Sequence, residues 1–374
     1  MRYPVSFSQR RLWFLDRLEP GEPTFNMAYQ MWLDGPLDSE ALQRAINALA
    51  ARHAALRTTI VALDGVPEQV VASTAAVPME RVDLSSAADG DAQAEPIAAD
   101  RARRPFDLGA GPLIRTALIA VRGDRHLLVL VMHHIISDGL SLEILVRELS
   151  ALYRAETTGQ PAALPAPWME YGDYALWQHD RMRGEELERQ LSYWREQLRG
   201  VPQVLTLPSD RPRPARLSSR GAAAAAAIDA ETTARLVKIG HDANATVFMV
   251  FLAGFATVLA RYARETDIVV GTQVSGRTRT ELEPIVGMFA NTVPLRLPLD
   301  GDPTFTDLIG RVKNATLGAL LHQEVPFEKL VEEFAPDRTL APVWLRRSRN
   351  AHPARPRDIR VHAGRSLEML AAPP

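Results

Sequence analysis

One apolar run constrains the fold of this chain more than any other feature. Residues Leu127–Val131 read Leu-Leu-Val-Leu-Val, without the polar residue at every second position that a half-exposed strand shows. A second strand-like segment, Leu113–Val121, precedes this run, and turn-forming residues join the two. After Gly139, leucines at helical spacing predict a helix to about Ala155. A strand that is buried on both faces and followed by an amphipathic helix indicates an α/β fold.

Helix and strand signals also alternate along the rest of the chain. A helix is predicted at Ser39–His53, and the stretch Thr157–Pro167, with three prolines and a glycine, marks the best internal boundary. Beyond that stretch, the predicted elements are helices at Tyr171–Leu198, Ala230–His241, Ala245–Arg264 and Phe305–His322, and strands at Asp267–Gly271 and Thr292–Leu299. No repeat of fixed period is visible, so two similar α/β lobes are favoured over a solenoid.

Composition excludes several kinds of site. The 374 residues include no cysteine, which rules out disulfides, thiolate-rich zinc sites, iron–sulfur clusters and cysteine nucleophiles. A net charge of −2 provides no global basic field for nucleic acid. None of the three lysines follows a glycine, which excludes a P-loop. Neither a Gly-x-Ser-x-Gly elbow nor a complete dinucleotide-binding glycine pattern occurs.

The chain also lacks the apolar segments that direct proteins to membranes. No window contains the roughly 18 consecutive apolar residues of a membrane-spanning helix. The N-terminus lacks the continuous apolar stretch of a signal peptide. We therefore expect a cytoplasmic protein.

The strongest chemical signal is His133-His134-Ile135-Ile136-Ser137-Asp138-Gly139, where the buried strand stops and the helix begins. Catalytic side chains are commonly placed on loops at strand ends. Adjacent strand residues point to opposite faces, so the two histidines cannot readily chelate one metal. A neutral imidazole can accept a proton at physiological pH, which suits the attack of an amine or a hydroxyl on an acyl carbon. The alternative is that both histidines are structural.

Asp138 has two interpretations. Its carboxylate could orient a histidine, as in a catalytic triad. It could instead face away and hold the loop through an arginine. The second interpretation is favoured, because a side chain four residues after His134 on a strand-to-turn path need not return to that histidine.

These residues resemble the condensation domains of nonribosomal peptide synthetases, a family of the chloramphenicol-acetyltransferase-like superfamily. Residues His133–Gly139 match the HHxxxDG signature, which other acyltransferases of that superfamily share. More specific motifs of the family occur in the same order along the chain, at Ser8–Leu15, Arg52–Thr58, Pro105–Leu113, Tyr171–Trp177, Val286–Thr292 and His322–Glu328. The collinear order of these six motifs is the main basis of the resemblance.

The resemblance implies a pseudo-dimer of two chloramphenicol-acetyltransferase-like lobes, residues 1–165 and 166–342, with a V-shaped opening. A donor acyl or peptidyl thioester and an acceptor aminoacyl thioester would enter from opposite sides, each carried on the phosphopantetheine arm of a carrier protein. The acceptor amine would attack the donor thioester, and an amide would form. The chain itself would bind no cofactor and no metal. Its partners would be the carrier proteins and adenylation domains of a synthetase, with no nucleic acid and no membrane.

The resemblance also assigns roles within the signature. His134 would be the active-site residue, either as a base or as the hydrogen-bond partner that positions the attacking amine. His133 would support it. Gly139 would let the backbone pass close to the substrate, which fits a residue without Cβ. The signature, as it stands in this chain, is most similar to the type that accepts L-configured donors.

Two supporting residues lie far from the signature in sequence. Arg277 would form an ion pair with Asp138 and so join the two lobes. Asn291 matches a family position near the substrate tunnel. Both residues are assigned by the family pattern alone.

The C-terminal residues depart from the family pattern. After Asp337–Pro342 the family continues with a strand and further elements that complete the second lobe. Here residues 343–374 carry seven arginines against Asp358 and Glu368 and show no strand pattern. We expect this basic tail to be disordered and the second lobe to be incomplete. A frameshift or premature stop would produce such an end, and so would a real basic tail; the alternative reading frame past codon 342 distinguishes them.

Two other functions stay open. The first is O-acyl transfer by a relative that uses a free alcohol or a coenzyme A thioester; the motifs at Arg52–Thr58, Tyr171–Trp177 and His322–Glu328 argue against it. The second is a non-catalytic remnant or docking module, which agrees with the unusual C-terminal end. Analysis of the reaction product separates both from amide formation.

Overall fold

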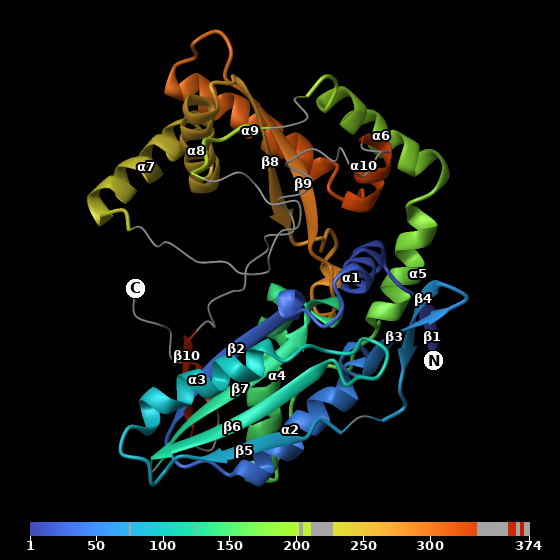
Figure 1. Ribbon diagram of the computed structural model, residues 1–374, viewed down its shortest axis with the longest axis vertical. Coiled ribbons are helices and arrows are strands. Elements are labelled where there is room, and N and C mark those ends of the chain that lie inside the picture. The colour runs from blue at the N-terminus through green and yellow to red at the C-terminus, as the bar shows by residue number, and fades with distance from the viewer. Residues whose placement is uncertain are drawn as a thin grey trace. The chain divides into compact units, whose positions relative to one another are not determined.

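The computed structural model describes residues 1–74, 76–122, 124–201, 205–210, 227–334, 358–363 and 367–369. The chain divides into two compact units. Unit 1 comprises Met1–Arg181, Arg277–Phe289 and the C-terminal segment from His352, and unit 2 comprises Met182–Gly276 and Ala290–Ala351. Figure 1 labels the helices and strands of both units.

Unit 1 is built around a six-stranded mixed sheet in the order β11-β10-β2-β7-β6-β5 (Figure 1). Its strands are β2 (Asn26–Asp34), β5 (Met79–Asp83), β6 (Ile114–Arg122), β7 (Arg125–His133), β10 (Asp358–Ala363) and β11 (Leu367–Met369). Strand β7 pairs antiparallel with both β2 and β6, so it lies inside the sheet. Residues Leu127–Val131 on β7 are all buried, which confirms the predicted strand that is covered on both faces.

Helices cover this sheet. Helix α3 (Gly90–Arg103) packs on one face, where Ala94 joins Val129 and Val131 in a buried cluster. Helices α2 (Ser39–Arg52) and α4 (Gly139–Thr158) pack on each other and lie behind the sheet in the view of Figure 1. Both were predicted at these positions. Each begins at an aspartate whose side chain accepts a hydrogen bond from a first-turn amide.

Smaller elements complete unit 1. A three-stranded antiparallel sheet has the order β1-β4-β3, with β1 at Arg2–Pro4, β3 at Thr58–Leu63 and β4 at Val66–Val71. The remaining helices are α1 (Phe7–Leu18) and α5 (Tyr171–Arg181), with single 3₁₀ turns η1 (Pro23–Phe25), η2 (Ala54–Arg57), η3 (His134–Ile136) and η4 (Thr280–Leu282).

Unit 2 contains the two-stranded antiparallel sheet β8-β9, with β8 at Asp267–Val274 and β9 at Asn291–Pro298. Its helices are α6 (Gly184–Gln197), α7 (Ala230–Asp242), α8 (Val247–Ala263), α9 (Phe305–Leu321) and α10 (Phe327–Phe334). One buried cluster connects Trp194 on α6, Ile268 on β8, Leu297 on β9 and Ile309 on α9. The predicted strands and the helices at α7, α8 and α9 are confirmed, with ends that differ by a few residues.

One predicted helix is wrong. The segment Tyr171–Leu198 was expected to be a single helix, but α5 ends at Arg181 and α6 starts at Gly184. Gly184 has a φ of +59°, a left-handed conformation that a helix interior does not accept. The amphipathic pattern continues through this break because each of the two helices buries its own face.

The boundary between the units also differs from the predicted boundary, which lay between residues 165 and 166. Helix α5 and the segment Arg277–Phe289 both group with unit 1. The Tyr171 hydroxyl on α5 explains this grouping, because it hydrogen-bonds to Ser6 Oγ and to the carbonyl oxygen of Met288. Side-chain packing, and not the proline-rich stretch, decides where α5 belongs.

We expected the C-terminal tail to have no strands, and that expectation is wrong. Strand β10 pairs parallel with β2 from Asp358↔Gln30 to His362↔Asp34, and β11 pairs antiparallel with β10. The sequence Asp-Ile-Arg-Val-His-Ala of β10 alternates polar and apolar residues, a period-two pattern that our prediction overlooked. Residues 343–357, on which the frameshift hypothesis depends, lie outside the described part of the chain.

In the part of the chain that the structure describes, no single helix has the length and apolar character to cross a membrane. The pair α7 and α8, bent by 105°, meets the length and composition criteria only when the two helices are taken together.

Candidate active site

The signature His133–Gly139 forms a short loop between the end of β7 and the start of α4. Strand β7 ends at His133, the residues His134–Ile136 form the turn η3, and α4 begins at Gly139. Two of its side chains cap the turns that follow them: His133 Nδ1 accepts a hydrogen bond from the Ile135 amide (3.1 Å), and Asp138 Oδ1 accepts one from the Ser141 amide (2.8 Å). These two caps give the loop a defined shape.

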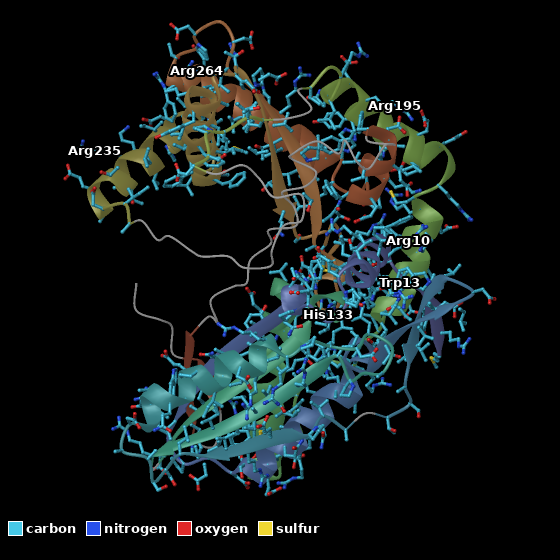
Figure 2. All side chains as sticks on the ribbon, viewed as in Figure 1. Arg10, Trp13, His133, Arg195, Arg235 and Arg264 are labelled. Atoms are coloured by element: carbon cyan, nitrogen blue, oxygen red, sulfur yellow. The ribbon has the colours of Figure 1, made fainter. Side chains whose placement is uncertain are left out.

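His133 is a buried, neutral residue of the protein interior. Its exposed fraction is 3%, and its ring lies edge-on to the rings of Phe25 and Phe106, with centroids 6.2 Å away in both cases. Since Nδ1 accepts the hydrogen bond of the Ile135 amide, the ring proton of the neutral form is on Nε2. Burial, and then the neighbouring His134, lower the pKa of His133 to about 3. His133 (Figure 2) therefore has a structural role in the loop.

His134 has the opposite tautomer and is half-buried. Its Nδ1 lies 2.8 Å from the carbonyl oxygen of Ser137. A carbonyl oxygen can only accept, so Nδ1 carries the proton and Nε2 keeps a free lone pair. Burial lowers the pKa of His134, against the opposing effect of the Ser137 carbonyl, so the imidazole is neutral at physiological pH. Nε2 of His134 can accept a proton or a hydrogen bond.

The hydrogen bonds described for the Asp138 carboxylate go to groups other than His134. Its Oδ1 accepts hydrogen bonds from the amide (2.8 Å) and the hydroxyl (2.7 Å) of Ser141, and its Oδ2 accepts from Arg277 Nη1 (2.6 Å) and the Phe289 amide (3.1 Å). The triad alternative for this residue is therefore wrong, and the predicted loop-holding arginine is confirmed. The physical reason is that Oδ1 caps the first turn of α4 while Oδ2 is bonded to Arg277 and the Phe289 amide.

The Arg277–Asp138 ion pair is almost completely buried, with side chains 2% and 4% exposed. Arg277 Nη2 also donates to the Ile285 carbonyl (2.9 Å) and to Ser141 Oγ (3.0 Å), and the guanidinium lies 4.2 Å from the centroid of the Phe289 ring. We expected this pair to join two lobes. The structure instead places both residues in unit 1, because the segment Arg277–Phe289 packs there.

Sequence reasoning missed three residues that hold this segment in place. Ser141 Oγ accepts a hydrogen bond from the Gly287 amide (3.1 Å) in addition to its bond to Asp138. The ring of Tyr171 lies so close to Gly287 that a Cβ at that glycine would be 1.9 Å from it. Tyr171 and Gly287 belong to motifs that carried the family resemblance, so their presence was noted without their contacts. Ser141 follows the signature by two residues and carried no signal of its own.

Gly139 differs from Gly287, because none of the residues that the structure describes requires a glycine there. A Cβ at Gly139 would meet no atom within 4 Å, and Gly139 is not among the glycines with positive φ. It is exposed at the first position of α4. The space in front of this backbone is therefore open to an incoming group.

Asn291 lies at the start of β9 in unit 2, and its carboxamide hydrogen-bonds to main-chain groups of the same unit. Its Nδ2 donates to the carbonyls of Gln323 (2.9 Å) and Val325 (2.7 Å), and its Oδ1 accepts from the Phe327 amide (3.1 Å). The carboxamide thus joins β9 to the loop before α10. It has no donor left for a ligand.

The described residues include no group of three or more histidines and carboxylates that could hold a metal ion. The chemistry available to the loop is that of a neutral imidazole whose Nε2 can bind or take a proton from an attacking nucleophile. Asp138, Arg277 and Ser141 bond to one another, so their role is to fix the loop.

Comparisons with known proteins identify the family of this chain. A family model described as "Condensation domain" matches residues 1–343. One polypeptide of the linear gramicidin synthase of Brevibacillus parabrevis is 42% identical over 340 residues, which are 90% of this chain and 4% of that protein. Phosphinothricin tripeptide synthetase PhsC of Streptomyces viridochromogenes is 42% identical over 339 residues, 90% of this chain and 31% of that protein. The chain therefore spans less than a third of either relative.

Solved structures confirm the expected fold class. The X-domain from teicoplanin biosynthesis has a TM-score of 0.82 and 33% identity, over 91% of this chain and 76% of that one. The first condensation domain of the CDA synthetase has a TM-score of 0.75 and 24% identity, over 90% of this chain and 80% of that one, and is similar in fold alone.

Proposed function

The chain belongs to the condensation-domain family, and on that basis we propose that it catalyses amide-bond formation in nonribosomal peptide synthesis. The substrates are a donor acyl or peptidyl thioester and an acceptor aminoacyl thioester, each presented on the phosphopantetheine arm of a carrier protein. Relatives that are peptide synthetases support this class of reaction. One solved relative, 25% identical, is a four-domain nonribosomal peptide synthetase bound to AMP and glycine, which supports carrier and adenylation domains as partners.

The observation that carries the proposal is the tautomer of His134. Because Nδ1–H donates a hydrogen bond to the Ser137 carbonyl oxygen, the lone pair of Nε2 is free to bind the acceptor amine. The amine nitrogen attacks the thioester carbon, a C–N bond forms and the C–S bond breaks. The proton that the nitrogen loses passes to the leaving thiolate, either directly or by way of Nε2. The chain supplies no cofactor to this step.

Positioning supplies much of the rate in this mechanism. Two reactants that are held in the right geometry gain about 7–11 kcal/mol relative to free reactants in solution. His134 then contributes the alignment of the amine and a path for its proton, which is typically about 10²–10⁴-fold. Replacement of His134 should lower the rate without abolishing product.

The test is to incubate the full chain with a donor-loaded and an acceptor-loaded carrier and to weigh the acceptor carrier by intact mass spectrometry. Amide formation adds the mass of the donor acyl group to the acceptor. An unloaded donor carrier is the blank, and His134→Ala should slow product formation at unchanged secondary structure. A folded wild-type sample that gives no mass increase contradicts the proposal, and an acceptor that carries a hydroxyl in place of its amine tests O-acyl transfer.

A second candidate is a docking module that binds a partner without forming amides. A solved complex supports it: the X-domain of teicoplanin biosynthesis, 34% identical to this chain over 89% of its length, was determined together with OxyB. The mass-spectrometry assay separates the two candidates, because a docking module leaves the acceptor mass unchanged while it still binds a partner.

A further inference from the structure

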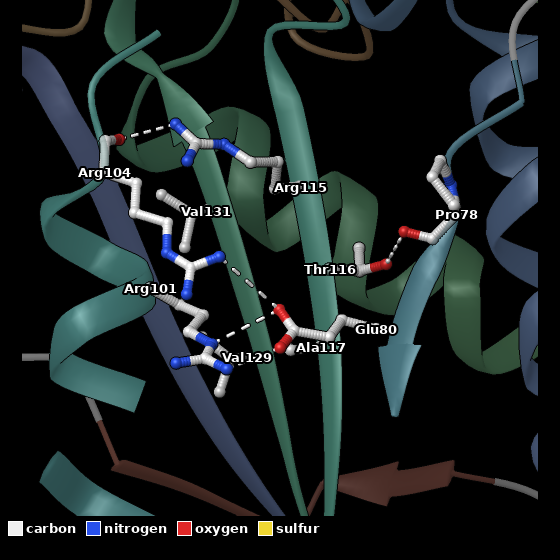
Figure 3. A pocket seen from close by; sticks show the side chains of 9 residues that line it. All are labelled: Pro78, Glu80, Arg101, Arg104, Arg115, Thr116, Ala117, Val129 and Val131. Atoms are coloured by element: carbon white, nitrogen blue, oxygen red, sulfur yellow. Dashed lines mark hydrogen bonds and ion pairs between the residues drawn. The ribbon is translucent and has the colours of Figure 1, made fainter. Parts of the chain in front are cut away.

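A small pocket in unit 1 lies between the C-terminal end of α3 and strands β5, β6 and β7 (Figure 3). Its volume is about 120 Å³. Ala117, Val129 and Val131 of the sheet form an apolar floor. A drug-sized ligand needs about 300–1,000 Å³, so this pocket fits one small chemical group. It is separate from the loop that carries His134.

The charged wall of the pocket has more cations than anions. Arg101, Arg104 and Arg115 line it together with one carboxylate, Glu80. Both Glu80 oxygens bond to Arg101, while Arg104 Nη1 is 3.9 Å from Glu80. Arg104 Nη2 donates a hydrogen bond of 3.0 Å to Asp100, which is the residue before Arg101 on α3. The two carboxylates are thus shared by Arg101 and Arg104.

Arg115 is left without an acid. Its Nη2 donates to the carbonyl oxygens of Arg104 (2.6 Å) and Pro105 (3.0 Å), and none of the described residues offers it a carboxylate within ion-pair distance. Burial, and then the positive charge of Arg104, lower the pKa of Arg115. A half-buried cation beside a second cation is costly until an anion neutralises it.

The guanidinium of Arg115 is also held in one plane. It lies 3.7 Å from the centroid of the Phe106 ring, while its Nη2 is directed at the two carbonyls. The contacts described for this group use Nη2 and the guanidinium face and leave the Nε and Nη1 donors available. A planar guanidinium presents its donors as a fork that matches two oxygens of a phosphate or a carboxylate. Since the fork is already oriented, a ligand loses little side-chain entropy on binding.

We propose that this pocket binds a small oxyanion, a phosphate group, through Arg115 and Arg104. A phosphate has the size for the pocket, and its negative charge compensates the excess of guanidinium groups. Glu80 opposes binding and limits the affinity, since its carboxylate already occupies Arg101. The site does not depend on the proposed function, because none of the residues that line it belongs to the loop His133–Gly139.

The test measures binding of inorganic phosphate to the full chain by isothermal titration calorimetry and by thermal unfolding, with sodium chloride at matched ionic strength. Wild type should show saturable binding and a Tm increase that chloride does not reproduce. Arg115→Gln should weaken phosphate affinity about tenfold or more, and Arg104→Gln about three- to tenfold. Arg103→Gln is the matched control, because Arg103 is exposed at the same end of α3 and does not line the pocket.

A gain of affinity separates binding from loss of folding. Glu80→Gln removes the competing carboxylate, so it should tighten phosphate binding about three- to tenfold. A parallel titration with phosphopantetheine distinguishes two sources of the phosphate group. If phosphopantetheine competes with inorganic phosphate for the pocket, the ligand is the arm of a carrier protein. If it does not compete, the ligand is the free anion. The proposal is overturned if chloride stabilises as well as phosphate does. It is also overturned if folded Arg115→Gln and Arg104→Gln bind phosphate like Arg103→Gln.

Discussion

Arg277→Ala is the change that most directly tests how the active-site loop is held. Arg277 and Asp138 form a buried ion pair, and removal of one partner of such a pair costs about 3–5 kcal/mol. Asp138 keeps three donors, the amide and hydroxyl of Ser141 and the Phe289 amide. The expected cost therefore lies near the lower limit, about 3 kcal/mol of unfolding free energy.

Urea unfolding followed by circular dichroism measures this cost. With a slope of about 2–3 kcal/mol per molar urea, the midpoint should fall by about 1–1.5 M. The matched control is Arg279→Ala, in the same segment. Arg279 is exposed, and its guanidinium lies 5.2 Å from the centroid of the Trp177 ring, so its loss should cost no more than about 1 kcal/mol.

A double-mutant cycle completes the experiment. Asp138→Ala combined with Arg277→Ala should cost clearly less than the sum of the two single changes, because each single change leaves a buried charge behind. If Arg277→Ala costs no more than Arg279→Ala, the pair does not hold the loop. Additive single costs would lead to the same conclusion.

Three further changes test the site. His133 is neutral in the folded protein down to pH about 3, whereas in the unfolded chain it takes up a proton below about 6.5. The free energy of unfolding should therefore fall on acidification through that window, by about 2 kcal/mol at pH 5. In urea titrations at several pH values, His133→Asn should remove this pH dependence, and the exposed control His241→Asn should not. The Cβ that Gly139→Ala adds would meet no atom within 4 Å, so Tm should be unchanged or slightly higher. The rate of amide formation should fall. Full activity at saturating substrate would refute a close approach of the substrate to this backbone. Gly287→Ala should lower the free energy of unfolding by more than about 2 kcal/mol, because the added Cβ would overlap the Tyr171 ring. Gly254→Ala on α8 is the control, because a Cβ there has open space. Equal unfolding midpoints for these two variants would contradict the packing argument.

Local patterns predicted several of the longer elements of both units. The unalternating run Leu127–Val131 predicted a strand buried on both faces. Asp38 predicted the start of α2, and leucines at helical spacing after Gly139 predicted α4. These predictions rest on near-neighbour physics, namely side-chain burial, helical spacing and the first-turn amides of a helix. The break at Gly184 was missed, and so were strands β1 to β5, β10 and β11 and helices α1, α3 and α10. A glycine inside an amphipathic pattern has no single conformation, and a short strand forms only where a neighbouring strand offers an edge.

The sequence by itself determined the chemistry of the loop: two histidines at a strand end, no cysteine, and an aspartate that precedes a helix. It could not determine which histidine keeps a free nitrogen. The tertiary structure decided that, because the proton position on His134 depends on the Ser137 carbonyl and that on His133 depends on the Ile135 amide. It also decided that Asp138 bonds to Arg277, 139 positions away. Residue identities limit what chemistry is available, but hydrogen-bond partners exist only once distant segments have packed together.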